Sequence, residues 1–331
     1  MVEPFAQEAK GVGSDWLSFL VHGKKVERQV CYNPPEPEIY FIDRRKSMTR
    51  SRFACCLVLT LSLSLFAAFS CAQVQQGTSE YRPVERQDGK DVVWLPTAQA
   101  LVDKMLDMAK VTPQDYVIDL GSGDGRTVIT AAKRGARALG VEFNPDMVTF
   151  ARRAAEKEGV SDKAKFVQGD LFQVDFSQAT VLTMFLLPEI NYKLRPKILD
   201  MKAGTRVVTN TFDMSDWTPD ETATINDSSR CSEYCTAMLW IVPAKVGGAW
   251  RLPNGEMVLE QTFQNFSGRL NSGSEGLLVK NGKLSGDQIS FFAGDAQYTG
   301  SVNGNSMKGT LKSGNKTAEW SATRVSKTAS P

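Results

Sequence analysis

Residues 117–123 combine an apolar segment, a carboxylate and a glycine-rich turn. Asp119 lies inside the apolar run Val117–Leu120, which leads directly into Gly121, Ser122 and Gly123. Glycines let the backbone approach a ligand closely and accept dihedral angles that other residues avoid. A carboxylate just before the turn would repel phosphate but suits an ammonium group. The spacing G-x-G-x-G also differs from the G-x-G-x-x-G of dinucleotide sites, so the turn favours a nucleoside ligand that carries positive charge.

Two further carboxylates follow apolar segments. Glu142 ends a segment about 20 residues after the turn, where dinucleotide folds bind ribose hydroxyls. Asp170, followed by Leu171, comes one glycine after Ala164–Gln168. Each acid has a simpler alternative, because Asp119 and Asp170 could cap a turn or helix and Glu142 could be a solvated strand end. Ligands of open α/β sheets bind outside the carboxyl ends of the strands, so we expect all three acids at one sheet edge.

Strand-like and helix-like patterns alternate from Asp115 to Pro243. This alternation predicts an α/β fold, with a mainly parallel sheet covered by helices on both faces. The expected strands are 116–120, 138–142, 164–168, 180–186, 206–211 and 234–242, and the expected helices are 98–109, 127–134 and 145–158.

After Pro243 the chain changes to short alternating segments separated by turn residues. Strands are expected at 257–263, 276–279, 288–292, 297–302 and 306–311. Asn281-Gly282 and Asn303-Gly304 are hairpin signals. Residues 246–327 are therefore expected to form a small all-β domain, either a β-meander or a small barrel. It could bind a substrate or cover an edge of the α/β domain.

The N-terminal region contains an apolar segment with a basic flank. Residues 48–72 run from Met48, through the apolar stretch 54–69, to small residues at Ala72, which is typical of a secretory signal peptide or an uncleaved membrane anchor. Residues 1–47 are then a doubtful, disordered extension and residues 73–92 a polar linker. The predicted location is periplasmic or secreted, with membrane anchoring as the alternative.

Composition limits the other classes of function. A chain of 331 residues with 42% hydrophobic residues can bury one substantial core and a smaller second one. The formal net charge of +2 does not favour a nucleic-acid partner. Cys231 and Cys235 could form a disulfide or remain two buried thiols. A metal site is not expected, because the single histidine, His22, lies in the doubtful extension.

The three acidic segment ends resemble those of class I S-adenosylmethionine (SAM)-dependent methyltransferases. Further motifs resemble the ATP synthase c-subunit lysine methyltransferase family and its bacterial relatives over residues 93–243: 93–97, 125–129, 142–145, 183–188 and 210–219. The resemblance implies a Rossmann-like seven-strand methyltransferase sheet in residues 93–245, SAM as the cofactor and a protein lysine amine as the methyl acceptor.

The resemblance also implies roles for individual residues. The methionine end of SAM would lie against Asp119, Gly121, Ser122 and Gly123, the ribose against Glu142, and the adenine region against Asp170 and Leu171, with Thr97 lining the cofactor from the N-terminal side. No catalytic residue is assigned. Glu189 or Tyr192 could help to deprotonate the amine, although Glu189 equally suits a helix-dipole role. Phe185 stands where members of that family often have a hydroxylated aromatic residue.

Two other functions compete with an active methyltransferase. An exported protein could use the α/β domain as a scaffold without catalysis and recognise a partner through the β domain. This alternative draws support from the apolar segment, because SAM is made in the cytoplasm. A nicotinamide dehydrogenase is the third interpretation, and the glycine spacing argues against it.

Overall fold

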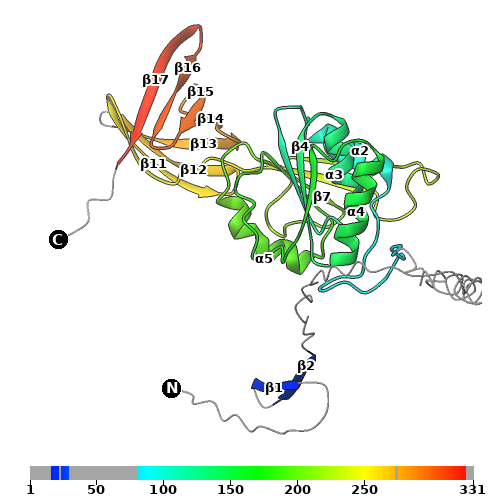
Figure 1. The fold of residues 1–331 in the computed structure, drawn as a ribbon. Coiled ribbons are helices and arrows are strands. Elements are labelled where there is room, and N and C mark those ends of the chain that lie inside the picture. The colour runs from blue at the N-terminus through cyan, green and yellow to red at the C-terminus, as the bar shows by residue number, and fades with distance from the viewer. Residues whose placement is uncertain (1–15, 22–23, 30–80, 273–274, 326–331) are drawn as a thin grey trace, which may run out of the picture. The chain divides into compact units, whose positions relative to one another are not determined.

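The computed structural model describes residues 16–21, 24–29, 81–272 and 275–325, and the chain divides into two units, 1–77 and 78–331 (Figure 1). In the first unit, β1 (Trp16–Val21) pairs with β2 (Lys24–Gln29) in an antiparallel sheet. These two six-residue strands lie within the extension 1–47 and are close enough in sequence to pair as a hairpin. The predicted signal or anchor at 48–72 lies outside the described residues. No described helix is long and apolar enough to span a membrane.

The second unit contains the predicted α/β sheet. Its seven strands have the order β5-β4-β3-β6-β7-β9-β8, and β9 runs antiparallel to both of its neighbours. The strands are β3 (Tyr116–Leu120), β4 (Arg137–Glu142), β5 (Ala164–Gln168), β6 (Val181–Met184), β7 (Arg206–Asn210), β8 (Glu221–Thr224) and β9 (Thr236–Ile241). The expected mainly parallel sheet is confirmed. The sequence pattern missed β8, because this short edge strand is largely exposed and carries no apolar run.

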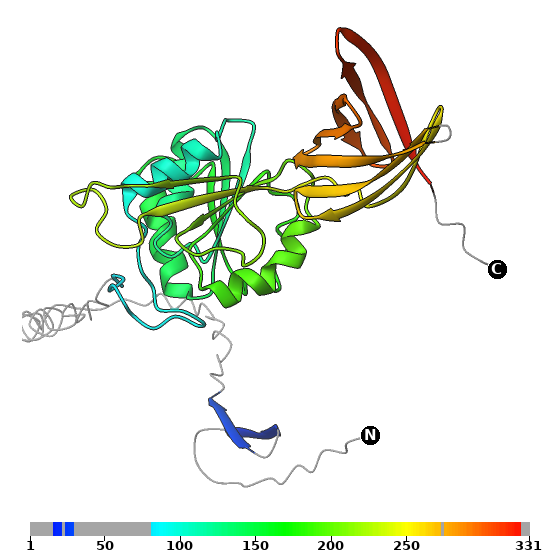
Figure 2. The same cartoon turned by 180° about the vertical axis from the view of Figure 1, so that it is seen from behind.

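Helices cover both faces of the sheet, as the alternating pattern predicted. They are α2 (Gln99–Met108), α3 (Arg126–Lys133), α4 (Pro145–Lys157) and α5 (Pro188–Leu199). Buried residues of α2, α3 and α4 share one core cluster, whereas those of α5 belong to a second cluster. Figure 2 shows the same layers from behind. Asn144 begins α4 by accepting hydrogen bonds from the amides of Asp146 and Met147, and Pro145 suits the first helical position.

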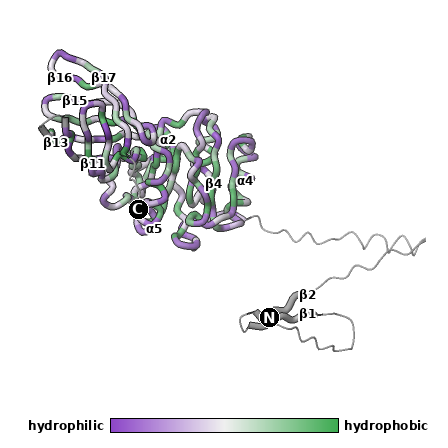
Figure 3. Tube along the Cα trace, turned by 90° about the vertical axis from the view of Figure 1, so that its left-hand side faces the viewer, coloured by the Kyte–Doolittle hydropathy of each residue, from purple (hydrophilic) through white to green (hydrophobic). Residues whose placement is uncertain are grey.

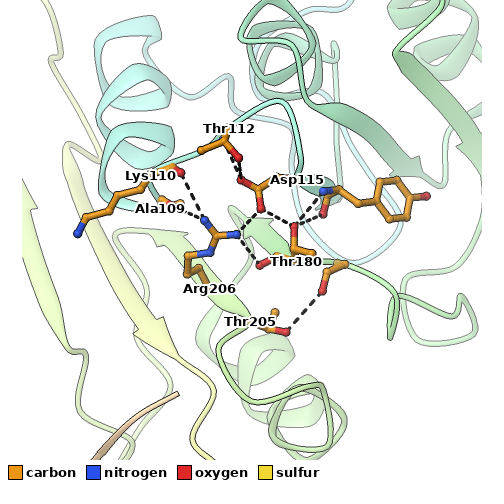
Figure 4. A network of polar contacts seen from close by, with 9 residues as sticks. Ala109, Lys110, Thr112, Asp115, Thr180, Thr205 and Arg206 are labelled. Atoms are coloured by element: carbon orange, nitrogen blue, oxygen red, sulfur yellow. Dashed lines mark hydrogen bonds and ion pairs between the residues drawn. The ribbon is translucent and has the colours of Figure 1, made fainter. Parts of the chain in front are cut away.

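A polar network holds the starts of three central strands together (Figure 4). Arg206, the first residue of β7, forms an ion pair with Asp115, which immediately precedes β3. The Thr180 hydroxyl, just before β6, donates to the same carboxylate at 2.8 Å. Burial alone would raise the pKa of Asp115, but the hydrogen bonds from Arg206, Thr112 and Thr180 outweigh it, so the pKa lies below its usual value. The network fixes the ends of the strands opposite to the predicted site.

The C-terminal domain is a closed barrel of eight antiparallel strands in sequential order. Hydrophobic and hydrophilic residues alternate along the strands (Figure 3). The buried hydrophobic residues of the barrel form one core cluster. The barrel closes where Trp250 and Arg251 of the first strand pair with the last strand. The strands are β10 (Gly248–Leu252), β11 (Gly255–Thr262), β12 (Asn265–Ser272), β13 (Glu275–Ser285), β14 (Gln288–Ala293), β15 (Ala296–Asn303), β16 (Ser306–Ser313) and β17 (Lys316–Arg324).

Only one of the two predicted Asn-Gly hairpins is a turn. Asn303-Gly304 marks the hairpin between β15 and β16, as expected: Asn303 ends β15 and Gly304 begins the turn. The prediction for Asn281-Gly282 is wrong, because both residues lie inside β13, where the register shifts between Lys280 and Lys283. A Cβ atom on Gly282 would come within 2.2 Å of the Phe266 carbonyl oxygen. The glycine therefore marks a β-bulge with close backbone approach.

Aromatic and backbone contacts join the barrel to the α/β domain. Trp217 stacks on Phe263 in the turn between β11 and β12, with ring centroids 5.9 Å apart. The next residue, Gln264, donates from its side chain to the Thr218 carbonyl at 2.8 Å. Trp217 and its neighbour Trp240 are fully buried. The two domains therefore share a packed boundary.

Candidate cofactor and acceptor site

One cavity of about 450 Å³ lies at the carboxyl ends of β3, β4, β5 and β6. The structure brings every residue that the sequence analysis assigned to the cofactor to its lining: Thr97, Asp119, Gly121, Ser122, Gly123, Glu142, Asp170 and Leu171. The parallel register explains this convergence, because Asp119, Glu142 and Asp170 each lie at or just beyond the end of neighbouring strands.

The glycine turn is shaped for close approach. Gly121 and Gly123 have φ values of +75° and +52°, a region that strongly favours glycine. The amides of Gly121 and Ser122 both donate to the Val141 carbonyl, which ties the turn to β4. A Cβ atom on Gly123 would lie 2.4 Å from Nε1 of Trp94. The indole of Trp94 therefore packs directly on the turn.

Asp119 is a buried carboxylate, with 7% of its surface exposed. The Thr183 hydroxyl donates to its Oδ1 at 2.7 Å. Burial, together with the nearby charges of Asp124 and Glu142, raises the pKa of Asp119 to about 7. Since none of the ion pairs found within residues 81–325 includes Asp119, a bound cation would stabilise its ionised form.

Glu142 braces the turn from the neighbouring strand. Its Oε2 accepts a hydrogen bond from the Gly123 amide at 3.0 Å, and its Oε1 accepts one from the Asn144 amide at 2.9 Å. Each carboxylate oxygen has two lone pairs, so both can still accept a hydroxyl group. Glu142 is thus more than a solvated strand end: it fixes the shape of the turn and keeps acceptor capacity.

Ser122 adds a polar group that needs a partner. Its side chain is buried, with 6% exposed, and its hydroxyl oxygen has no hydrogen-bond partner among the described residues. An unpaired buried hydroxyl costs free energy unless a ligand or water satisfies it. This orphaned group and the buried carboxylate fit a ligand with a positive charge and several polar atoms.

Residues 87–97, here called the strap, form one wall of the cavity. Lys90 of the strap donates to Oδ2 of Asp170 at 2.7 Å and lies 4.9 Å from the centre of the Phe143 ring. This hydrogen bond raises the pKa of Lys90 and lowers that of Asp170. Part of the segment expected as a linker, residues 87–92, thus also lines the cavity. Because this segment is polar, the sequence pattern gave no sign that Lys90 contacts Asp170 just beyond the end of β5.

Three aromatic residues, here called the aromatic triad, also line the cavity: Phe185, Phe212 and Tyr234. The ring centroid of Tyr234 lies 5.4 Å from that of Phe185 and 5.9 Å from that of Phe212, and the two phenylalanine rings are 6.1 Å apart. Sequence reasoning noted Phe185 and the motif around Phe212 but gave neither a place in the cavity. It did not place Tyr234 in the cavity. Tyr234 lies in a short loop closed by a disulfide between Cys231 and Cys235, so of the two alternatives the disulfide is the one observed.

The two candidate proton acceptors do not reach the cavity. Glu189 lies in the first turn of α5, where its charge complements the helix dipole. The Tyr192 hydroxyl donates to Oδ1 of Asp213 at 3.1 Å. Neither residue lines the cavity, and the described residues contain no group of acidic, cysteine or histidine side chains suited to a metal ion.

Known proteins are similar in sequence to part of this chain. The sequence profile of the ANTKMT methyltransferase domain matches residues 119–221. A protein-lysine N-methyltransferase of Saccharolobus islandicus is 45% identical over 141 residues, which cover 42% of this chain and 88% of that protein. The human lysine N-methyltransferase of the ATP synthase c-subunit is 33% identical over 162 residues, covering 45% of this chain and 69% of the relative.

A solved structure is similar over the same region. The RNA methyltransferase of Salinibacter ruber, crystallised with S-adenosyl-L-homocysteine, is 44% identical with a TM-score of 0.43, and the match covers 46% of this chain and 96% of the other. The identity to the lysine methyltransferases, and the share of their length that this chain covers, establish the family. The chain belongs to the ANTKMT family of SAM-dependent class I methyltransferases.

Proposed function

We propose that this enzyme transfers the methyl group of SAM to the side-chain amine of a protein lysine, and that the cavity residues bind both reactants. One observation carries the proposal: a buried carboxylate without a cationic partner among the described residues lies beside a glycine turn, on the sheet edge where two further carboxylates end neighbouring strands. A ligand that combines an ammonium group, a sulfonium and a ribose satisfies all of these groups together.

Each part of SAM has a partner in this arrangement. Asp119 holds the ammonium of the methionine end, and the backbone of Gly121 and Gly123 lies against the same part. Glu142 accepts the ribose hydroxyls. Asp170 and Leu171 line the adenine end, where Lys90 of the strap occupies one carboxylate oxygen of Asp170. Thr97 supports the pocket from the strap side, since its hydroxyl accepts a hydrogen bond from the Asn210 amide nitrogen at 3.2 Å.

The reaction requires little chemistry from the protein. SAM supplies a methyl group that is bonded to a positively charged sulfur. The lone pair of the neutral lysine nitrogen forms a bond to the methyl carbon, the carbon–sulfur electron pair remains on sulfur, and the amine proton passes to solvent. Holding the reactants in line removes much of the entropic barrier, so a strong base is not essential. This agrees with a chain whose only histidine is His22.

The lysine acceptor is supported by relatives and by the cavity. The Saccharolobus islandicus and human relatives are named as lysine methyltransferases. The aromatic triad gives the same cavity a wall suited to an alkyl amine, because ring faces attract cations and pack against methylenes. A non-catalytic scaffold role has no comparable support.

Binding and transfer can be tested separately. Isothermal titration of the full chain with SAM should give a saturable heat, and radiolabelled methyl should pass from SAM to poly-L-lysine. Asp119→Asn should lose both activities, while Asp295→Asn, in the turn between β14 and β15, should keep both. Folded protein that does not bind SAM would overturn the cofactor assignment. Transfer to RNA but not to poly-L-lysine would overturn the acceptor.

We further propose that residues 48–72 direct the enzyme out of the cytoplasm, either as a cleaved signal peptide or as a membrane anchor. The Cys231–Cys235 disulfide supports this, because disulfides persist mainly in oxidising compartments. Mass spectrometry of the mature N-terminus would distinguish the two forms. Cleavage should leave a chain that begins at Gln73, whereas an anchor should leave residues 48–72 in place. An intact chain in the soluble cytoplasmic fraction would contradict both.

A further inference from the structure

We propose that the loop closed by Cys231 and Cys235, here called the disulfide loop, determines acceptor specificity by positioning Tyr234. In this view Tyr234 completes the aromatic triad and forms the wall against which the lysine side chain lies during transfer. The inference rests on the proposed function, because it assigns the acceptor side of the same cavity.

The position of Tyr234 supports this role. It lines the cavity that also contains Asp119 and the glycine turn, and it packs against both phenylalanines of the triad. Even so, 38% of Tyr234 remains exposed. A large aromatic side chain that lines the cavity and is also partly accessible is suited to meet an acceptor that arrives from solvent.

The surroundings hold Tyr234 in an unusual backbone conformation. Its φ of +54° lies in the left-handed region, which a tyrosine rarely adopts unless neighbouring structure imposes it. The disulfide closes the chain on both sides of Tyr234. On one side, Glu233 forms a 3.1 Å ion pair with Arg86, just before the strap, and on the other the Cys235 carbonyl accepts from the Ile225 amide at 2.9 Å. These constraints hold the backbone that carries Tyr234, and the two phenylalanines of the triad pack against its ring.

The chemistry of the triad matches an alkyl amine better than other nucleophiles. The methylenes of lysine can pack on the rings. During transfer the positive charge moves from sulfur to nitrogen, and ring faces stabilise that charge. No carboxylate belongs to the triad, so the amine is not held as an ion pair, which would keep it protonated and unreactive.

The experiment compares Tyr234→Ala, Tyr234→Phe and the double variant Cys231→Ser/Cys235→Ser with the full-length wild type. Phe292→Ala is the matched control, because Phe292 is also an aromatic residue with 38% exposure but lies on the barrel strand β14. For each protein, the Kd for SAM is measured by calorimetry, and the KM and kcat are measured with poly-L-lysine. Thermal unfolding confirms that each variant is folded.

Tyr234→Ala should raise the KM for poly-L-lysine about tenfold, because the acceptor loses the aromatic surface against which its methylenes pack. Tyr234→Phe should stay within about twofold of the wild type, because the ring and not the hydroxyl provides the contact. The double serine variant, which keeps Tyr234 but frees its loop, should raise the KM in the same direction. The Kd for SAM should stay unchanged in all variants.

Two results would overturn this inference, and both differ from failure of the proposed function. If wild type methylates poly-L-lysine and Tyr234→Ala keeps the wild-type KM, Tyr234 does not contact the acceptor. If the double serine variant keeps the wild-type KM while Tyr234→Ala loses affinity, the disulfide does not position the ring. If wild type binds SAM but leaves poly-L-lysine unmethylated, the acceptor assignment itself fails, together with this inference.

Discussion

Replacing Asp119 by asparagine should stabilise the fold while removing cofactor binding. Burial lifts the pKa of Asp119 from 3.8 to about 7 in the folded protein. A carboxyl with a raised pKa binds its proton more tightly when folded, so its contribution to stability is fully present at pH values below 3.8 and is lost as pH rises to about 7. A shift of roughly 3 units corresponds to about 4 kcal/mol above pH 7.

Asparagine removes the charge but keeps an oxygen that can accept from Thr183. Urea unfolding should therefore show Asp119→Asn to be more stable than wild type at pH 8, by as much as about 4 kcal/mol. The gap should shrink by about 3 kcal/mol at pH 5, where the wild-type carboxyl is already mostly protonated. Asp295→Asn should show no such pH-dependent gap.

The affinity for SAM should also depend on the ionisation of Asp119. It should increase with pH up to about pH 7, whereas the contribution of Asp119 to stability decreases over the same range. The positive charges of SAM favour ionised Asp119, so the wild-type Kd should be constant above pH 7 and rise about tenfold for each pH unit below it. Asp119→Asn should bind weakly at every pH. An asparagine variant that binds SAM as tightly as wild type, or one that is less stable than wild type at pH 8, would refute the reasoning.

Three other substitutions test the surrounding framework. Gly123→Ala should weaken SAM binding at least tenfold in calorimetry, because its Cβ would collide with Trp94 and the residue must keep a positive φ; an unchanged Kd would contradict the proposed role of the turn. Arg206→Met should lower the free energy of unfolding by about 3 kcal/mol near neutral pH, because it leaves the charge of Asp115 unpaired. This loss should become smaller in acid, once the pH falls below the lowered pKa of Asp115 and the carboxyl is protonated. A loss of stability that does not depend on pH would count against the ion pair. Gly282→Ala should cost about 1–3 kcal/mol in urea unfolding, because the bulge leaves no room for a methyl group, and wild-type stability would show that the bulge adjusts freely.

The carboxyl-end site was predictable because its signals are local. Apolar segments that end in Asp119, Glu142 and Asp170 identify parallel strands, and parallel strands align their ends at one edge. The same reasoning could not find Lys90 or Tyr234. Each reaches the cavity through contacts between segments that are distant in sequence, and neither belongs to a periodic pattern.

The barrel shows a different limit. Alternation revealed several of its strands, and Asn303-Gly304 behaved as a turn. Asn281-Gly282 carries the same two letters but lies within a strand, because the turn preference of Asn-Gly competes with the pairing of long strands on both sides. At Gly282 a Cβ atom would lie 2.2 Å from the Phe266 carbonyl oxygen, a contact with the facing strand that the two letters alone do not reveal.

The stacked rings at Trp217 and Phe263 also bear on whether the α/β domain could be produced without the barrel. Trp217 is fully buried, and its indole stacks on a ring that belongs to the barrel. A truncated chain that ends before the barrel would expose this indole on its surface, and exposed apolar patches favour self-association. The α/β domain therefore depends on the barrel for its solubility.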